Sequence, residues 1–469
     1  RKRVIWEQVQ AVARQAGGRA MENDDLLEEV SFLLEYPTAF MGNFSPTYLD
    51  VPPEVLTTSM IAQQRYFPVF DDQQRLLPAF IGVRNGTDVS LDIVKAGNER
   101  VLKARLEDAL FFWKEDTSKA LAEFVLGLKD VMFHERLGSV MNKVERLQKL
   151  AVFIGQATGL STPEKLERAA TLCKADLLSN MVYEFPELQG IMGRYYALKS
   201  QEDEEVANAL LEHYMPRFAG DHLPASPTGL VLALAEKTDN LVACFAIGIR
   251  PSGSQDPYAL RRQALGIVNI MLDLDLTIDF SSIIGAAYQG LINVKTEMGL
   301  EQITDELMDF IRQRLRGILL DKGYTFDVVD AVLALSLTDL RDILRRVRGV
   351  QDFKASTQVE DFMVVFNRSY NLSKKWTSTV VAPERLQDES EQKLYQHYLG
   401  VKQVVEQCIQ EKDYQAVLNV LTSLRADLDQ FFTAVMVMVE DEALKAARLG
   451  ILRSIAELCN TVADFTKIN

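Results

Sequence analysis

Four polar side chains in the middle of the chain are of types that bind divalent metal ions. Asp176, His213, Asp221 and Glu236 lie in or beside segments that the sequence predicts to be helical. Carboxylates and an imidazole gathered inside a helical bundle could hold metal ions for the hydrolysis of a phosphoester. The alternative is that these groups brace the helices through hydrogen bonds. We favour the alternative because no histidine in the chain is followed directly by an aspartate, and we keep a metal-dependent phosphohydrolase as a second hypothesis.

Basic side chains gather on two predicted helices. One helix ends in the densest basic run of the chain, which includes Arg345, Arg346 and Arg348. This run could contact phosphate groups, although cations also stabilise the C-terminal end of a helix by about 0.3–1 kcal/mol without any ligand. The last predicted helix has a basic edge beside apolar residues, formed by Lys445, Arg448 and Arg453. Such an edge is either an RNA-binding face or an ordinary solvated surface, and both interpretations stay open.

The composition argues against several other kinds of protein. The sequence has no GxGxxG motif opening a helix, no GxxxxGK[ST], no GxSxG and no HExxH. Its four histidines are too few to favour a histidine-based metal site. Its four cysteines form no CxxC pair and are expected to be reduced. The net charge of -15 argues against indiscriminate nucleic-acid binding but allows one local basic face. No apolar run approaches the roughly 20 residues of a membrane helix, so we expect no membrane partner.

The elements that would position these side chains change in character along the chain. Residues 1–97 mix helix with short apolar runs, and the runs at 67–70 and 79–83 flank a polar turn, which predicts a hairpin or two neighbouring strands. Asn98 is predicted to cap a helix over residues 99–114. Beyond residue 116 nearly every segment has helical periodicity. The stretch 174–196 organises this part, because its apolar positions predict a buried helix that breaks at Pro186 and Gly190.

Seven stretches, spread over nearly the whole chain, are more specific than any short motif. They read YFPVF (66–70), GNERVL (97–102), DALFFW (108–113), KADLLSNMVYEFPELQGIMGRYYA (174–197), RFAGD (217–221), DPYALRR (256–262) and FFTAVMVM (431–438). Together they resemble the β subunit of the bacterial heterotetrameric glycyl-tRNA synthetase. The chain begins at Arg1 without an initiator methionine, so we expect a fragment that lacks the family's N-terminal segment.

The resemblance implies a mainly helical, multidomain protein. Residues 1–115 would form an α+β domain similar to part of the phenylalanyl-tRNA synthetase β subunit, and residues 116–275 an HD-like helical domain. Residues 276–352 would form a helical linker or body. Residues 353–469 would form a helical-bundle anticodon-binding domain of the DALR type, which is also found on arginyl-tRNA synthetase.

Two departures from the family pattern bear on the expected sites. The HD-type histidine is missing, because residues 172–177 read LCKADL, and Glu236 follows Ala235 where an aspartate is usual. We therefore expect a degenerate HD-like site of Asp176, His213, Asp221 and Glu236, without a metal. In the last domain Ala447 precedes Arg448 where the family often has asparagine.

The resemblance implies a non-catalytic subunit of a glycine–tRNA ligase in the cytoplasm, which positions tRNA(Gly) for aminoacylation by a separate α subunit in a heterotetramer. ATP, with Mg, is expected on the α subunit, and no cofactor on this chain. The expected tRNA contacts are cationic or aromatic: Arg345, Arg346, Arg348, Arg368, Tyr370, Lys374, Lys375, Trp376, Lys445, Arg448 and Arg453. Charge reversal at Arg448 is expected to weaken tRNA binding with little loss of thermal stability. The alternatives are the HD-type metal-dependent phosphohydrolase and a purely architectural helical scaffold.

Overall fold

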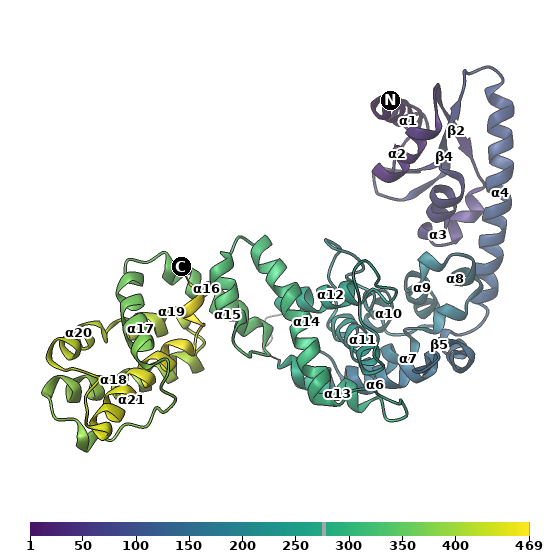
Figure 1. The fold of residues 1–469 in the computed structure, drawn as a ribbon. Helices are drawn as coiled ribbons and strands as arrows, with labels where there is room; N and C mark the ends of the chain where they lie inside the picture. The colour runs from purple at the N-terminus through teal and green to yellow at the C-terminus, as the bar shows by residue number, and fades with distance from the viewer. Residues whose placement is uncertain (274–277, 469) are drawn as a thin grey trace. The chain divides into compact units, whose positions relative to one another are not determined.

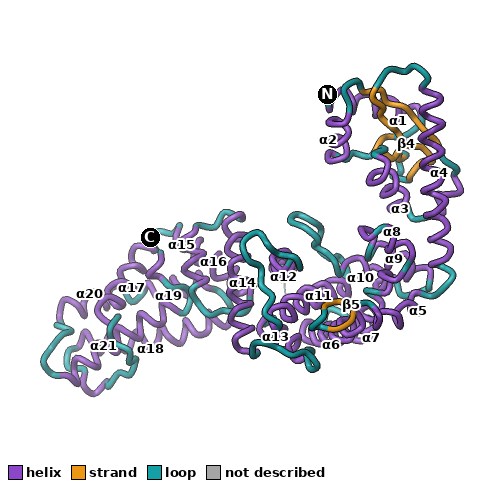
Figure 2. Tube along the Cα trace, turned by 45° about the vertical axis from the view of Figure 1, so that its right-hand side comes forward, coloured by secondary structure: helices purple, strands orange, loops and turns teal. Residues whose placement is uncertain are grey.

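The computed structural model describes residues 1–273 and 278–468 (Figure 1). The chain divides into two units. Unit 1 comprises Arg1–Pro216 and Asp221–Glu236, and unit 2 comprises Arg217–Gly220 and Lys237–Asn469. Within the described ranges the strands all lie in unit 1, and unit 2 is built from helices and loops (Figure 2). The predicted class, mainly helical with a small N-terminal sheet region, is confirmed.

The sheet of unit 1 has four antiparallel strands in the order β1 (Arg19–Ala20), β3 (Phe67–Phe70), β4 (Leu76–Asn85) and β2 (Pro37–Asn43). The pairing of β3 with β4 confirms the predicted hairpin. Helices α1 (Lys2–Gln15) and α2 (Asp24–Leu33) share one hydrophobic core with the sheet. Gly42 of β2 faces the fully buried ring of Phe80 on β4, and an added Cβ would lie 2.1 Å from that ring.

The helix after the sheet is longer than the sequence predicts. Helix α4 runs over Leu91–Asp116, so the predicted cap Asn98 lies inside it. Asn98 instead donates from Nδ2 to the carbonyl of Val94 and accepts a hydrogen bond from the Tyr66 hydroxyl. The predicted N-cap was wrong, because the side-chain amide of Asn98 forms these two hydrogen bonds and does not cap a helix end. The short elements η1 (Pro46–Asp50), α3 (Pro53–Thr58) and η2 (Ser59–Gln63) lie between β2 and β3.

The rest of unit 1 consists mainly of further helices. They are α5 (Leu121–Val125), η3 (Leu126–Asp130), α6 (Val140–Thr158), α7 (Pro163–Leu172), η4 (Ala175–Leu178), α8 (Asn180–Glu184), η5 (Pro186–Leu188), α9 (Ile191–Lys199), α10 (Glu204–Glu212) and the start of α11 (Pro227–Ala246). The small strands β5 (Met132–His134) and β6 (Gly138–Ser139) form a second sheet. The buried helix predicted from residue 174 is two short turns, η4 and α8, because Ser179 caps α8 by accepting from the Val182 N–H at 3.2 Å. The predicted breaks at Pro186 and Gly190 are confirmed.

Unit 2 continues from the second half of α11 with further helices. They are α12 (Leu260–Asp273), α13 (Phe280–Gln289), α14 (Leu300–Asp321), α15 (Phe326–Leu333), α16 (Leu340–Lys354), α17 (Val359–Ser373), η6 (Pro383–Arg385), α18 (Glu389–Gln410), α19 (Tyr414–Thr422), α20 (Arg425–Ala434), α21 (Glu442–Asn460) and η7 (Phe465–Lys467). Helix α17 packs on α19, α20 and α21, and α18 packs on the same three helices. The boundary expected between residues 275 and 276 lies outside the described residues, and the one between 352 and 353 falls inside α16.

None of the helices in the described ranges is both long enough and apolar enough to span a bilayer.

Candidate functional site

The supposed metal-binding residues of unit 1 surround two lysine side chains. Lys174 Nζ lies 3.2 Å from Glu236 Oε1, and Lys143 Nζ lies 3.3 Å from Glu236 Oε2. Lys174 Nζ also lies 2.8 Å from His213 Nε2. All four side chains are buried. Ammonium groups therefore occupy the positions beside the carboxylate and the imidazole that a metal ion would need. We call these four residues the lysine cluster.

Hydrogen bonding to the backbone assigns the tautomer of His213 in this cluster. His213 Nδ1 lies 2.8 Å from the carbonyl of Leu210, so Nδ1 carries the proton and Nε2 accepts from the Lys174 ammonium. Burial by itself would raise the pKa of Glu236, but Lys143 and then Lys174 hold it well below its usual range. The cluster is thus an ion-paired brace. Among the residues that the structure describes, no group of three or more His, Cys, Asp or Glu side chains could hold a metal ion.

The two aspartates of the expected site are engaged with the backbone. Asp176 is buried, and its Oδ2 accepts from the N–H groups of Gly190 and Gly193 at 2.6 and 3.1 Å. Burial raises the pKa of Asp176 to about 6. Asp221 lies in the loop between α10 and α11, where its Oδ1 accepts from the N–H of His222. The metal-dependent phosphohydrolase hypothesis is therefore not supported by these residues.

Two of the arginines expected to contact RNA are buried. Arg346 is only 7% exposed, and its Nε lies 2.7 Å from Asp342 Oδ2 of the same helix. The Arg448 side chain is also 7% exposed, and its Nε lies 2.6 Å from Oε2 of the fully buried Glu391. Arg448 Nη1 donates to the carbonyl of Met436 at 2.8 Å. Arg346 Nη1 also donates to the carbonyl of Thr461, so both arginines connect segments of unit 2. The expectations for these two arginines are corrected, because neither guanidinium is open to RNA.

The other expected contact residues are either partly buried or exposed. Lys445 and Arg453 form ion pairs within α21. Tyr370 is partly buried and stacks on Phe366 with ring centroids 5.4 Å apart. The half-buried members of the expected set also include Arg345 and Trp376. The exposed members are Arg348, Arg368, Lys374 and Lys375.

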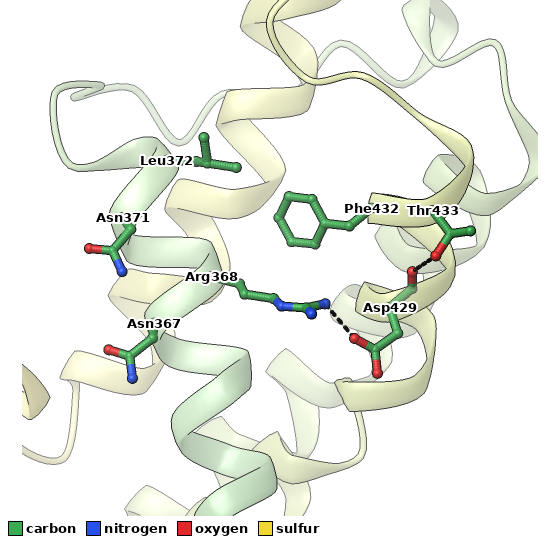
Figure 3. Close-up of a pocket in the computed structure, with 7 residues that line it drawn as sticks. All are labelled: Asn367, Arg368, Asn371, Leu372, Asp429, Phe432 and Thr433. Atoms are coloured by element: carbon green, nitrogen blue, oxygen red, sulfur yellow. Dashed lines mark hydrogen bonds and ion pairs between the residues drawn. The ribbon is translucent and has the colours of Figure 1, made fainter.

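A pocket of about 590 Å³ lies between α17 and α20 (Figure 3). Its lining consists of Asn367, Arg368, Asn371, Leu372, Asp429, Phe432 and Thr433. The Arg368 guanidinium extends from α17 to α20, where Nη1 lies 2.5 Å from Asp429 Oδ1, and its Cζ lies 5.6 Å from the centre of the Phe432 ring. Lys374 and Lys375 follow directly at the end of α17. We call this set of lining residues the α17–α20 pocket.

Sequence reasoning found only Arg368 of this pocket. The two amides, Asn367 and Asn371, are one helical turn apart on α17, but exposed asparagines on a helix are common and give no specific signal. Asp429 and Phe432 come from α20, about sixty positions later in the chain, as the separation of 61 between Arg368 and Asp429 shows. Together they combine an aromatic face, amide groups and an ion pair, which suits an unstacked nucleobase.

Two family profiles match the chain. The family described as "Glycyl-tRNA synthetase beta subunit" matches residues 1–334, and the family described as "DALR anticodon binding domain" matches residues 365–468. The α17–α20 pocket thus lies within the second match, and the lysine cluster within the first.

Relatives match along the whole length of the chain. A protein of Syntrophomonas wolfei named "Glycine--tRNA ligase beta subunit" is 63% identical over 468 residues, which cover 100% of this chain and 68% of that protein. Proteins of the same name from Desulforamulus reducens and Clostridioides difficile are 46% and 42% identical, with 100% of this chain covered in both cases and 68% of each relative. The chain therefore belongs to the glycyl-tRNA synthetase β-subunit family.

Proposed function

We propose that this chain binds tRNA(Gly) and positions it for aminoacylation by a glycyl-tRNA synthetase α subunit. The observation that supports this most directly is the α17–α20 pocket, which combines base-binding chemistry with two exposed lysines inside the region matched by the anticodon-binding family. Bases of a single-stranded loop are bound by stacking on aromatic rings and by hydrogen bonds to their edges. Lys374 and Lys375 would contact the adjoining phosphates.

Several finer points belong to the same proposal. The chain acts in a cytoplasmic heterotetramer, ATP with Mg²⁺ binds on the α subunit, and this chain contributes no catalytic residue. Residues 1–115, 116–275, 276–352 and 353–469 serve as the α+β, HD-like, linker and anticodon-binding parts. The lysine cluster supports a structural role for the second part, since Lys143 and Lys174 already neutralise Glu236.

The test is a filter-binding titration of the full chain with the anticodon stem-loop hairpin of tRNA(Gly). Phe432→Ala removes a stacking surface worth about 1–3 kcal/mol per base, so affinity should fall by roughly fivefold or more. Lys374→Glu together with Lys375→Glu should weaken binding and flatten its salt dependence, by about 0.7 in slope for each single-strand phosphate that the lysines neutralise.

The matched control is Lys402→Glu, which changes an exposed lysine of α18 that pairs with Glu406. Its affinity should equal that of the unmodified chain, and thermal melting should show that all variants are folded. Hairpin affinity that is unaffected by both the Phe432 and the lysine changes would refute the pocket assignment. Absence of any salt-sensitive tRNA binding would instead favour the architectural scaffold.

A further inference from the structure

Arg261, Arg262 and Arg314 of unit 2 have no carboxylate ion-pair partner among the residues that the structure describes, and the helices that carry them, α12 and α14, pack on each other. The chain as a whole is acidic, with a net charge of -15. The neighbouring arginines of α14 are paired, Arg312 with Asp309 at 2.9 Å and Arg316 with Asp330 at 2.6 Å. Positive charge that is left unneutralised at one place in an acidic protein is a candidate anion site.

The acidic residue closest in sequence to the first two arginines is already engaged with the backbone. Asp256 Oδ1 accepts from the N–H of Leu260 at 2.7 Å, and Oδ2 accepts from the N–H of Arg261 at 2.9 Å. Both carboxylate oxygens therefore bind the first turn of α12. Arg262 is exposed and the Arg261 side chain is partly exposed, so their guanidinium groups remain accessible at this end of the helix.

Aromatic packing holds the third arginine in place. Arg314 Cζ lies 3.6 Å from the centre of the Phe310 ring, and Nη1 donates to the Phe310 carbonyl at 2.9 Å. Phe310 in turn packs edge-on against Phe245, with ring centroids 5.4 Å apart. Partial burial lowers the pKa of Arg314, and the charge of Arg261 lowers it further, while Asp256 opposes both effects without reversing them. Because α12 and α14 pack on each other, the guanidinium groups of Arg261 and Arg314 lie on neighbouring helices, and a bound anion would relieve their repulsion.

We propose that Arg261, Arg262 and Arg314 bind phosphate groups of the tRNA backbone outside the anticodon loop. This inference rests on the proposed tRNA-binding function. Guanidinium groups present several N–H donors in a plane and bind phosphate in a bidentate manner. The three arginines lie on α12 and α14, in the part matched by the synthetase β-subunit family, whereas the α17–α20 pocket lies in the anticodon-binding match. The two sites would thus contact different parts of one RNA.

The experiment compares whole tRNA(Gly) with its anticodon stem-loop hairpin as ligands of the full chain. The variant Arg261→Gln with Arg262→Gln leaves the packing of Arg314 on Phe310 untouched. We expect it to bind whole tRNA about tenfold more weakly and the hairpin as before, and its salt slope should be smaller by about 0.9 for each duplex phosphate that it no longer neutralises. Arg314→Gln should act in the same direction. The control is Arg316→Gln, an ion-paired arginine two positions along the same helix, and it should leave both affinities unchanged.

The outcomes separate this inference from the proposed function. If the unmodified chain binds neither RNA, the proposed function fails. If it binds both, and the arginine variants retain full affinity for whole tRNA, the arginine site alone is wrong. Equal losses for the hairpin and for whole tRNA would also overturn it, because the effect would not be confined to this site. Inorganic phosphate is the third probe: if it stabilises the unmodified chain but not the arginine variant, while tRNA affinity is the same for both, the site takes free phosphate rather than RNA.

Discussion

The buried ion pair between Arg448 and Glu391 should be a main determinant of the stability of the C-terminal helices. Both side chains are less than 10% exposed and their charged atoms are 2.6 Å apart. Removal of one partner from such a pair leaves an uncompensated buried charge and costs about 3–5 kcal/mol. Arg448→Met would also leave the Met436 carbonyl without its donor, which adds about 1 kcal/mol. We therefore expect a destabilisation of about 4–6 kcal/mol.

The matched control on the same helix is Lys445→Met. Lys445 pairs with Glu442, whose side chain is 77% exposed, so the loss should stay within about 1 kcal/mol. Urea titration of the full chain gives the free energy of unfolding. Hydrogen exchange at the amides of α18 and α21 shows whether the loss is located in these helices.

A second change tests the electrostatic cause. Glu391 Oε1 accepts from the N–H groups of Gln387 and Asp388 at the start of α18. Glu391→Gln keeps that acceptor and removes the charge, so adding it to Arg448→Met should restore part of the lost stability. The reasoning is refuted if Arg448→Met costs no more than Lys445→Met, or if the double variant is less stable than Arg448→Met alone.

Three further changes test unit 1. Asp176→Asn removes a carboxyl whose pKa in the folded chain, about 6, exceeds its usual 3.8. Because this carboxyl loses its proton at lower pH in the unfolded chain, the free energy of unfolding falls by about 3 kcal/mol as pH rises from below 4 to above 6. The stability of the unmodified chain relative to this variant should therefore fall over that interval, and urea titrations at pH 4, 5, 6 and 7 measure it; a pH-independent difference would contradict the assignment. Lys174→Met leaves Glu236 with one buried ammonium instead of two and should lower the free energy of unfolding by about 3 kcal/mol in the same assay. Gly42→Ala forces a methyl group against the buried Phe80 ring and should lower the free energy of unfolding by about 1–3 kcal/mol, which a lower melting temperature would show. An unchanged melting temperature would show that the sheet accommodates the methyl group without strain.

Local patterns in the sequence predicted elements whose stabilising contacts are local. The β3–β4 hairpin follows from two apolar runs around a polar turn, and the breaks at Pro186 and Gly190 follow from backbone chemistry. Asn98 shows the limit of such reasoning, because its amide bonds to Tyr66 from another element and the helix continues past it.

Side chains whose role depends on distant partners were not predictable in this way. A basic residue between leucines looks the same whether it faces RNA or a buried carboxylate, and Arg448 finds its partner 57 positions away. His213 and Glu236 of the lysine cluster were identified as site residues, but their partners Lys143 and Lys174 were not, because an ammonium group is not a metal ligand. The α17–α20 pocket needs two helices that only tertiary packing brings together.

The lysine cluster has a consequence for how unit 1 reaches and keeps its folded state. Its positive charges are covalent parts of the chain, so they arrive in fixed number with every copy that is synthesised. A bound ion would have tied folding to the supply of that ion and to competition from chelators. Two amino groups in its place make the core insensitive to both, and they keep Glu236 neutralised for as long as the chain itself is intact.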